Sequence, residues 1–299
     1  MAQPPRPGDI FYSSLPLREI RSALEAIAGD PRASPEARQE AGGYLASVSQ
    51  ILAHRDATMA AAVQHAAAEV VVDPARGTFL EARLEDALIA GWQTAGGEPS
   101  RARVQLTVPG WDPQPGQTDW VATAPSGELV AIAELKVTDV EAALWDLLKV
   151  AAILTEETAA TGYLVVATSP SKWERAEVSD LFATPPGETA TWWTGDLLLR
   201  WAASWRWLLS GGRARPVRLP GRLRTTVLAD APTEHIAGHS LRCLKVEPDL
   251  GAPHLDLIDG QPQWGEQVTT RDLLTREEEA AGLRDSLEEQ RERMRRRHA

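Results

Sequence analysis

Two acidic residues and a lysine stand inside two short apolar segments near the middle of this chain. Asp119 lies in the first segment, 117–122, and Glu134 and Lys136 lie in the second, 129–137. A carboxylate is costly to bury unless it has an ionic partner or a metal ion. Carboxylate oxygens suit Mg²⁺, a bound metal ion activates water and stabilises phosphoryl charge, and a nearby lysine stabilises developing negative charge. These residue types therefore indicate metal-assisted hydrolysis of a phosphodiester.

The spacing of the three residues predicts that a β-hairpin brings them together. A Pro-Ser-Gly turn at 125–127 separates the two apolar segments, which is the sequence form of a hairpin. Side chains alternate along a strand, so Glu134 and Lys136 share one face. With the turn centred on its first two residues, Asp119 pairs with Ile132 and lies diagonally from Glu134, roughly 7–8 Å away. A slip of one residue would move Asp119 to the other face, so the site depends on the register.

Regular elements are expected on both sides of the hairpin. Apolar residues at helical spacing predict a helix over 77–88, and alternating residues predict a strand over 103–108. After the hairpin, a helix is expected over 138–161, with Gly162 placed to end it, followed by a buried strand over 162–167. A capping-box pattern, Thr138 with Glu141 three residues later, supports the start of that second helix.

The three site residues and this order of elements resemble the PD-(D/E)xK nuclease superfamily, which has the restriction-endonuclease-like fold. The resemblance covers residues 77–170. Thr118 stands where the family pattern has proline. The fold class implied is α/β, with a restriction-endonuclease-like core in which helices flank a central mixed sheet. An N-terminal helical unit and a C-terminal α+β extension are expected around that core.

The resemblance also implies roles for individual residues. Asp119 and Glu134 would hold Mg²⁺, for which Mn²⁺ can substitute, and the Leu135 carbonyl is a further candidate ligand. Lys136 would orient or activate the attacking water. The first helix of the core is expected to supply another acid to the catalytic and metal-binding cluster.

Two positions outside the hairpin remain open between alternatives. Glu81 matches the expected helix acid best, and Glu85, one turn further along, is the alternative. Lys149, in the helix after the hairpin, is interpreted as a boundary lysine with its ammonium in water, or as a residue that faces the site and contacts nucleic acid.

Composition bounds the class of protein. The chain has 299 residues, a net charge of −11, 43% hydrophobic and 24% charged residues, which suits a globular protein of one or two domains. Its single cysteine, Cys243, excludes an internal disulfide. We find no apolar run long enough to cross a membrane and no apolar core of a signal peptide at the N-terminus, so a cytoplasmic protein is expected.

An arginine-rich stretch is the main candidate for contact with nucleic acid, despite the acidic total. Between Asp196 and Asp230 the chain has no acid and no lysine, but seven arginines. Arginine binds phosphate with two donors, and the interleaved tryptophans can stack on unpaired bases. The alternative is a helix whose tryptophans are buried and whose arginines are solvated. The candidate nucleic-acid contacts are Arg200, Arg206, Arg213, Arg215, Arg218 and Lys149.

The chain divides into four expected parts. Residues 1–72 form a helical unit with helices over 17–27, 35–55 and 57–71, which could mediate a homodimer or bind a protein partner. Residues 73–170 form the nuclease-like core, residues 171–265 the Trp/Arg-rich extension, and residues 266–299 a charged helical tail.

These observations predict a Mg²⁺-dependent nuclease, an endonuclease-like hydrolase acting on DNA, with a role in prokaryotic defence or DNA processing. That role is extended from the family alone. The alternative is a non-catalytic module with the same fold that binds nucleic acid or a protein partner. A third interpretation treats Glu134 and Lys136 as an ordinary ion pair on a solvated strand face.

Overall fold

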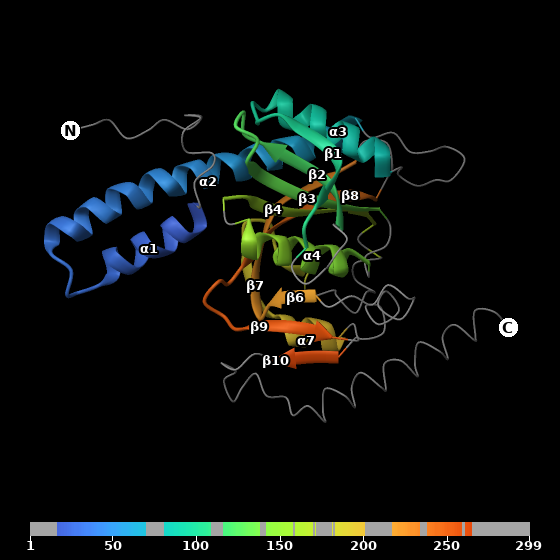
Figure 1. Ribbon diagram of the computed structural model, residues 1–299. Helices are drawn as coiled ribbons and strands as arrows, with labels where there is room; N and C mark the ends of the chain where they lie inside the picture. The colour runs from blue at the N-terminus through green and yellow to red at the C-terminus, as the bar shows by residue number, and fades with distance from the viewer. Residues whose placement is uncertain are drawn as a thin grey trace, which may run out of the picture.

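The computed structural model of the chain is shown in Figure 1. It describes residues 17–69, 81–108, 116–137, 142–157, 159–169, 171, 181, 183–200, 217–233, 238–258 and 261–264. Within these residues the chain is a mixed α/β structure. Helices lie at the N-terminus, a seven-stranded mixed sheet is packed between helices, and a second sheet has three strands.

The large sheet contains both early and late segments of the chain. Its strand order is β1-β2-β3-β4-β8-β7-β5, in which β3 and β4 pair parallel and the other neighbours pair antiparallel. Its strands are β1 (Ser100–Leu106), β2 (Gly116–Thr123), β3 (Leu129–Val137), β4 (Thr161–Thr168), β5 (Thr189–Trp193), β7 (Arg222–Pro232) and β8 (Ser240–Pro248). Strands β7 and β8, which belong to the expected extension over 171–265, therefore continue the sheet that holds the hairpin.

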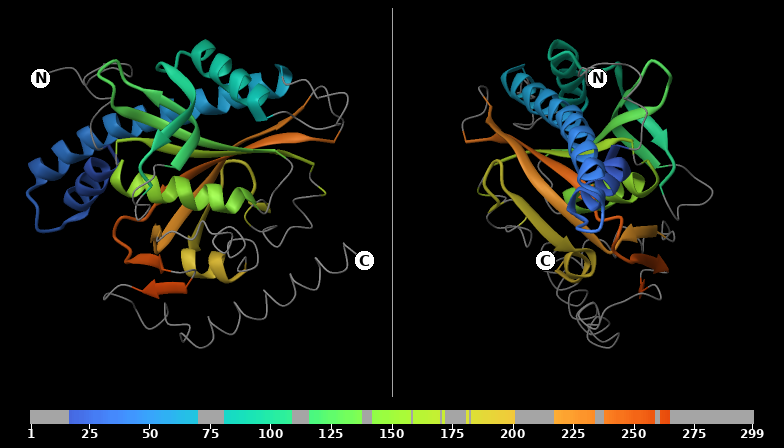
Figure 2. Two further views of the ribbon diagram at one scale, coloured as in Figure 1. Left: turned by 45° about the vertical axis from the view of Figure 1, so that its right-hand side comes forward. Right: turned by 90° about the vertical axis from the view of Figure 1, so that its left-hand side faces the viewer.

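Helices cover both faces of this sheet (Figure 2). On one face, α4 (Ala142–Glu156) packs through residues such as Leu147 onto Ile132 of β3 and Leu164 of β4. On the other face lie α2 (Pro35–Glu69) and α3 (Glu81–Thr94). There the rings of Trp92 and Trp120 meet edge to face, 5.0 Å between centroids. The order α3, β1–β2–β3, α4, β4 is the order expected from the sequence, and it positions the candidate site between α3, α4 and the hairpin.

The hairpin turn lies where the sequence places it, but it contains an additional residue. Pro125 and Ser126 are its central residues, and the amide of Gly127 donates to the carbonyl of Ala124 at 2.9 Å. Gly127 has a φ of +95°, which glycine adopts without steric cost and which marks a bulge after the turn. This bulge shifts the pairing of the two strands by one residue.

A second irregularity shifts the pairing again, between Ala122 and Thr123. Beyond it, Trp120 pairs with Ala133, and continuing this register places Asp119 opposite Glu134. The predicted pairing of Asp119 with Ile132 was therefore wrong by two residues. Because two single shifts add to an even number, the face assigned to each strand position is unchanged.

The N-terminal helices also differ from the prediction. Residues 35–69 form one continuous helix, α2, where two helices were expected. Arg55 and Asp56, at the expected break, are helix residues with tertiary partners. Arg55 donates to the carbonyl of Ala159 at 2.9 Å, and Asp56 accepts a hydrogen bond from Tyr163 at 3.1 Å. Helix α1 (Leu17–Gly29) packs along α2, and Figure 1 shows the pair extending beyond the sheet.

Gly162 does not end the second core helix, as was predicted. Helix α4 ends at Glu156, and Gly162 lies inside β4. A Cβ atom at Gly162 would come within 2.4 Å of Leu154 and 2.6 Å of Val150. The glycine therefore serves close packing of α4 on β4. The expected capping box at 138–141 lies outside the described residues.

The remaining described elements follow β4. Helix α7 (Thr194–Arg200) continues from β5, and strands β6 (Val217–Pro220), β9 (His254–Ile258) and β10 (Gln261–Trp264) form the small sheet in the order β10-β9-β6. Residues 201–216 of the Trp/Arg stretch and the tail 266–299 lie outside the described residues. No described helix combines the length and the apolar character needed to cross a membrane.

Candidate functional site

Three carboxylates meet where the start of α3 approaches β2. Glu81 and Glu85 lie one turn apart on α3, and Asp119 lies in β2. One oxygen from each carboxylate lies within 4.8 Å of the others. A cluster with oxygen ligands at this spacing fits a hard divalent cation. Both residues that the sequence left as alternatives for the helix acid, Glu81 and Glu85, are in this cluster, hereafter called the acidic cluster.

Asp119 is held where β2 and β3 separate. The pairing of these strands reaches Trp120 and Ala133, and just beyond it the amide of Leu135 donates to Asp119 Oδ2 at 2.8 Å. Because amides of a strand point along the plane of the sheet, the Asp119 carboxylate lies near that plane, between β3 and α3. A backbone donor thus fixes the orientation of the carboxylate that joins the hairpin to the acidic cluster.

Glu134 is not part of the acidic cluster, although it lies in β3 opposite Asp119. Its side chain is 1% exposed, and its Oε2 lies 2.6 Å from the ammonium of Lys149. Its Oε1 is buried and has no hydrogen-bond partner among the described residues. Burial raises the pKa of Glu134 well above its usual range; Lys149 opposes the rise, and Asp146 and Asp119 add to it. A buried carboxylate oxygen without a partner is what a ligand or cation would satisfy.

Lys149 is a buried member of the site, so the interpretation as a boundary lysine in water was wrong. Its side chain is 9% exposed. Besides Glu134, its ammonium contacts the backbone carbonyl of Gln117 at 2.9 Å. The ammonium therefore bridges β2 and β3 at the end where the two strands separate. This position does not leave Lys149 on the surface for nucleic acid.

Lys136 faces α4, where it forms an ion pair with Asp146 at 3.0 Å. Burial alone would lower the pKa of Lys136, but the fields of Asp146, Glu81 and Asp119 raise it instead. Burial also raises the pKa of Asp146, with Lys149 and Lys136 opposing the rise. Lys136 is therefore a cation at neutral pH, held beside the acidic cluster by a residue of α4.

Arg103 adds a second cation at the outer side of the cluster. It lies in β1 opposite Asp119, between the paired residues Ala102 and Val104. Its φ is +56°, in the left-handed region, where a residue with a side chain is strained. Its Nε lies 3.0 Å and 3.3 Å from the two oxygens of Glu85. The local distortion of β1 thus coincides with the position where its guanidinium meets the acids.

Burial and neighbouring acids raise the pKa values of two carboxyl groups of the cluster, Glu81 and Glu85. Burial raises the pKa of Glu81, and Asp119, Asp146 and Glu85 raise it further while Lys136 opposes them. The pKa of Glu85 is raised by burial, against the hydrogen bond from Arg103. Nearby acids disfavour ionisation of each other. The cluster therefore favours either a proton or a metal ion.

Sequence reasoning did not identify Asp146 or Arg103. Each lies in an element that the sequence predicted, but nothing in the local pattern marks it as a partner of the site. The only signal for Asp146 was its spacing of three residues from Lys149, which places the two on one helix face. For Arg103 the distinguishing feature is its left-handed backbone conformation, which the sequence does not indicate.

The predicted arginine contacts are mostly untested by this structure. Arg206, Arg213 and Arg215 lie outside the described residues, as does the side chain of Arg200. Arg218 is exposed on β6.

Comparison of the chain with protein-family models, with curated proteins and with solved structures finds no match.

Proposed function

We propose that the chain is a Mg²⁺-dependent nuclease of the restriction-endonuclease-like fold that hydrolyses phosphodiester bonds in DNA. The observation that carries the proposal is the acidic cluster of Glu81, Glu85 and Asp119 beside Lys136. The order α3, β1–β2–β3, α4, β4 supports it, because this order positions α3 and the hairpin around one end of the sheet.

The donor set fits the proposed metal ion. Glu81, Glu85 and Asp119 offer three carboxylate oxygens, whereas Glu134 is paired with Lys149 and lies outside this group. A bound Mg²⁺ would activate water and stabilise charge on a phosphoryl oxygen. Compared with the expectation from the sequence, both helix acids are proposed as metal ligands, and Glu134 is more deeply buried. The Leu135 carbonyl remains a proposed ligand, and the Leu135 amide orients Asp119.

Lys136 supplies the positive charge that hydrolysis needs. Its ammonium is partly exposed, and Asp146 holds it on the α4 side of β3. A cation at this place stabilises negative charge on the phosphate or orients the attacking water. Asp146 then acts as a positioning residue, because it contacts Lys136 rather than the reacting atoms.

The second candidate is a non-catalytic module that binds nucleic acid or a protein partner. One observation favours it. Lys149 is already paired with Glu134, so a cation of the chain occupies one oxygen that the sequence expectation assigned to a metal ion. The two candidates differ in one respect that can be measured, which is whether DNA is cut when Mg²⁺ is present.

The test is cleavage of supercoiled plasmid, linear duplex and single-stranded DNA by the full chain with Mg²⁺ or Mn²⁺. Wild type is expected to cut, and Lys136→Met to cut slower on the order of 10²-fold. The exposed Arg38 of α2 provides a control: Arg38→Ala should cut like wild type. Binding of DNA without cleavage of any form would favour the non-catalytic module.

A role in prokaryotic defence or DNA processing belongs to the same proposal and is carried by the resemblance. A homodimer or a protein partner is proposed to use the α1–α2 pair, which extends beyond the sheet and exposes Ile27 and Tyr44.

A further inference from the structure

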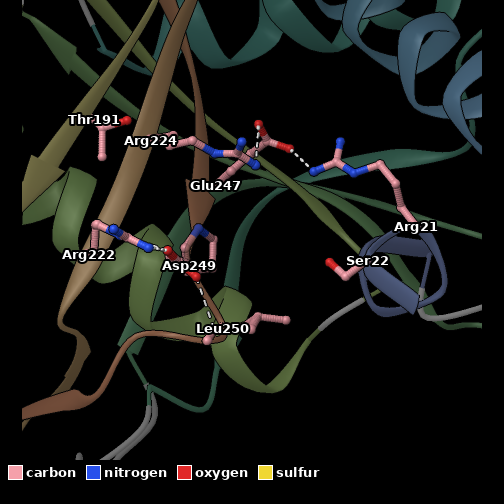
Figure 3. Close-up of a pocket in the computed structure, with 10 residues that line it drawn as sticks. Arg21, Ser22, Thr191, Arg222, Arg224, Glu247, Asp249 and Leu250 are labelled. Carbon is pink, nitrogen blue, oxygen red and sulfur yellow. Dashed lines mark hydrogen bonds and ion pairs between the residues drawn. The ribbon is translucent and has the colours of Figure 1, made fainter. Parts of the chain in front are cut away.

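A polar pocket of about 630 Å³ lies between α1 and the β7–β8 side of the large sheet (Figure 3). Arg21 and Ser22 reach it from α1, Arg222 and Arg224 from the start of β7, and Glu247 from the end of β8. The pocket shares no lining residue with the acidic cluster.

The pocket and the acidic cluster lie at opposite ends of the sheet. Val246, near the end of β8, pairs with Gly162 at the start of β4. Strands β3 and β4 are parallel, so the start of β4 lies at the end of the sheet where β3 also begins. Glu134 lies near the other end of β3. The pocket is therefore a separate site.

Two of the three arginines are held in place by acids. Arg21 Nη2 lies 3.2 Å from Glu247 Oε1, and Arg222 Nε donates to Asp249 Oδ2 at 2.7 Å. Figure 3 shows these side chains converging with their carboxylates between α1 and the strands. Such contacts fix guanidinium groups in one orientation and so reduce the entropy lost when a ligand binds.

Arg224 is held more loosely than the other two. Its ion pair with Glu247 spans 3.9 Å, beyond hydrogen-bonding distance, and its side chain is 47% exposed. Its donors therefore point at a carboxylate that Arg21 already engages. An incoming anion could take the Arg224 donors without breaking a close contact.

The charges around Glu247 are predominantly positive. Burial would raise the pKa of Glu247, but Lys245, Arg21 and Arg224 together hold it below its usual value. In a chain of net charge −11, a pocket whose field favours an ionised acid also favours an anionic ligand.

We propose that this pocket binds a small phosphate-bearing ligand of about mononucleotide size. Guanidinium groups match phosphate oxygens in geometry and charge. The hydroxyls of Ser22 and Thr191 line the same pocket and can donate further hydrogen bonds. Its volume lies within the range of about 300–1,000 Å³ typical of small-molecule sites. Because the lining comes from α1, β5, β7 and β8, the bound ligand fixes α1 on the sheet.

The test is calorimetric titration of the full chain with adenosine 5′-monophosphate, with inorganic phosphate and with adenosine. The nucleotide is expected to bind and adenosine is not, because the phosphate carries recognition. Arg224→Ala should weaken the nucleotide on the order of tenfold. Arg38→Ala removes the same charge from an exposed site outside the pocket and should bind like wild type. Circular dichroism verifies that each variant is folded. Because Arg224 is exposed, its replacement by alanine is expected to leave the fold intact.

Three results would overturn the inference. The first is that neither the nucleotide nor inorganic phosphate binds wild type. The second is that Arg224→Ala binds the nucleotide as tightly as wild type does. The third is that adenosine binds as tightly as its monophosphate. A titration with a short DNA duplex distinguishes a small ligand from a nucleic-acid backbone. Binding of the duplex alone, lost in Arg224→Ala, would assign the pocket to a nucleic-acid backbone and reject the small ligand. With EDTA present throughout, none of these results depends on whether the acidic cluster cuts DNA.

Discussion

The acidic cluster shows how a site can be set up at the expense of stability. Glu81, Glu85 and Asp119 lie close enough to repel one another, and the two cations nearest to them are already paired, Arg103 with Glu85 and Lys136 with Asp146. Repulsion of this kind persists where a site is used for binding. Removing one acid should therefore stabilise the metal-free protein and at the same time weaken metal binding.

The variant Glu81→Gln tests whether stability and metal binding change in opposite directions. The metal-free variant is expected to unfold a few degrees above wild type, because one charge leaves a cluster in which the pKa values of Glu81 and Glu85 are raised. The stabilisation that Mg²⁺ adds should shrink in the variant. Thermal unfolding with EDTA and with Mg²⁺ measures both effects. Glu36→Gln, at an exposed position of α2, is the matched control; an undiminished Mg²⁺ shift in Glu81→Gln would contradict the assignment.

Arg103 is expected to compete with the metal ion for Glu85. Arg103→Gly removes the guanidinium and suits the left-handed backbone, whereas Arg103→Ala removes the guanidinium and keeps the strain. The glycine variant should be more stable than the alanine variant by about 1 kcal/mol. Both should bind Mg²⁺ several-fold more tightly than wild type.

Cleavage provides the second measurement on the same variants. If Glu85 turns to the metal ion, Arg103 becomes available to a phosphate, so both variants should cut DNA more slowly while binding metal more tightly. Calorimetry and a cleavage assay separate these effects. Weaker metal binding in Arg103→Gly would show that Arg103 only supports the fold.

At the scale of elements, the buried pair of Glu134 and Lys149 joins β3 to α4. Lys149→Met should lower the free energy of unfolding by about 3–5 kcal/mol at pH 8, because it leaves a buried carboxylate without its cation. The loss should be smaller at pH 5, where the raised pKa of Glu134 allows it to be neutral.

The double variant Glu134→Gln, Lys149→Met completes a mutant cycle and should recover part of that loss. Chemical denaturation of the four proteins measures the coupling. A coupling near zero at pH 8 would mean that the pair does not hold the two elements together.

The sequence predicted these elements well because their signals are local. Helical spacing of apolar residues located α3 and α4, and alternation with a Pro-Ser-Gly turn located β2 and β3. The register could not be predicted, because the bulges at Gly127 and at Ala122/Thr123 depend on backbone geometry. Two shifts happened to preserve the face assignment.

Contacts between distant segments were beyond local patterns. Nothing near Lys149 indicates that it reaches Glu134 and the carbonyl of Gln117. Likewise, nothing near Arg55 or Asp56 indicates partners at Ala159 and in β4. Charged residues in an apolar pattern suggested a helix break or a solvated position. In the structure, their tertiary partners allow them to be buried.

For the whole molecule, the balance of charges predicts how stability changes with pH. Glu81, Glu85, Glu134 and Asp146 all have folded-state pKa values raised above their usual range. Between the unfolded carboxyl pKa of about 4 and those raised values, the folded state holds more protons than the unfolded state. Stability contributed by these groups is therefore lost as pH rises through that window. Glu247, with a lowered pKa, acts in the opposite sense and loses its contribution as pH falls.

The metal-free protein is accordingly expected to lose thermal stability between pH 5 and neutral pH, and Mg²⁺ should offset much of that loss. Unfolding temperatures across this range, with EDTA and with Mg²⁺, measure the effect. Glu81→Gln should show a shallower decline than wild type in EDTA. A metal-free protein whose stability rises steadily to neutral pH, with an equal slope in the variant, would reject the raised pKa values as the cause.

The most direct test of the central claim is calorimetric titration of Mn²⁺ and Mg²⁺ into wild type and Asp119→Asn. Asparagine keeps the shape of Asp119 and an oxygen that can accept from the Leu135 amide, but removes the charge. Wild type is expected to bind divalent cation with proton release that declines as pH rises, since metal ligands must deprotonate. Asp119→Asn should bind at least tenfold more weakly, on the order of one lost charged ligand. Absence of binding to wild type, or equal binding to both proteins, would contradict the proposed metal site.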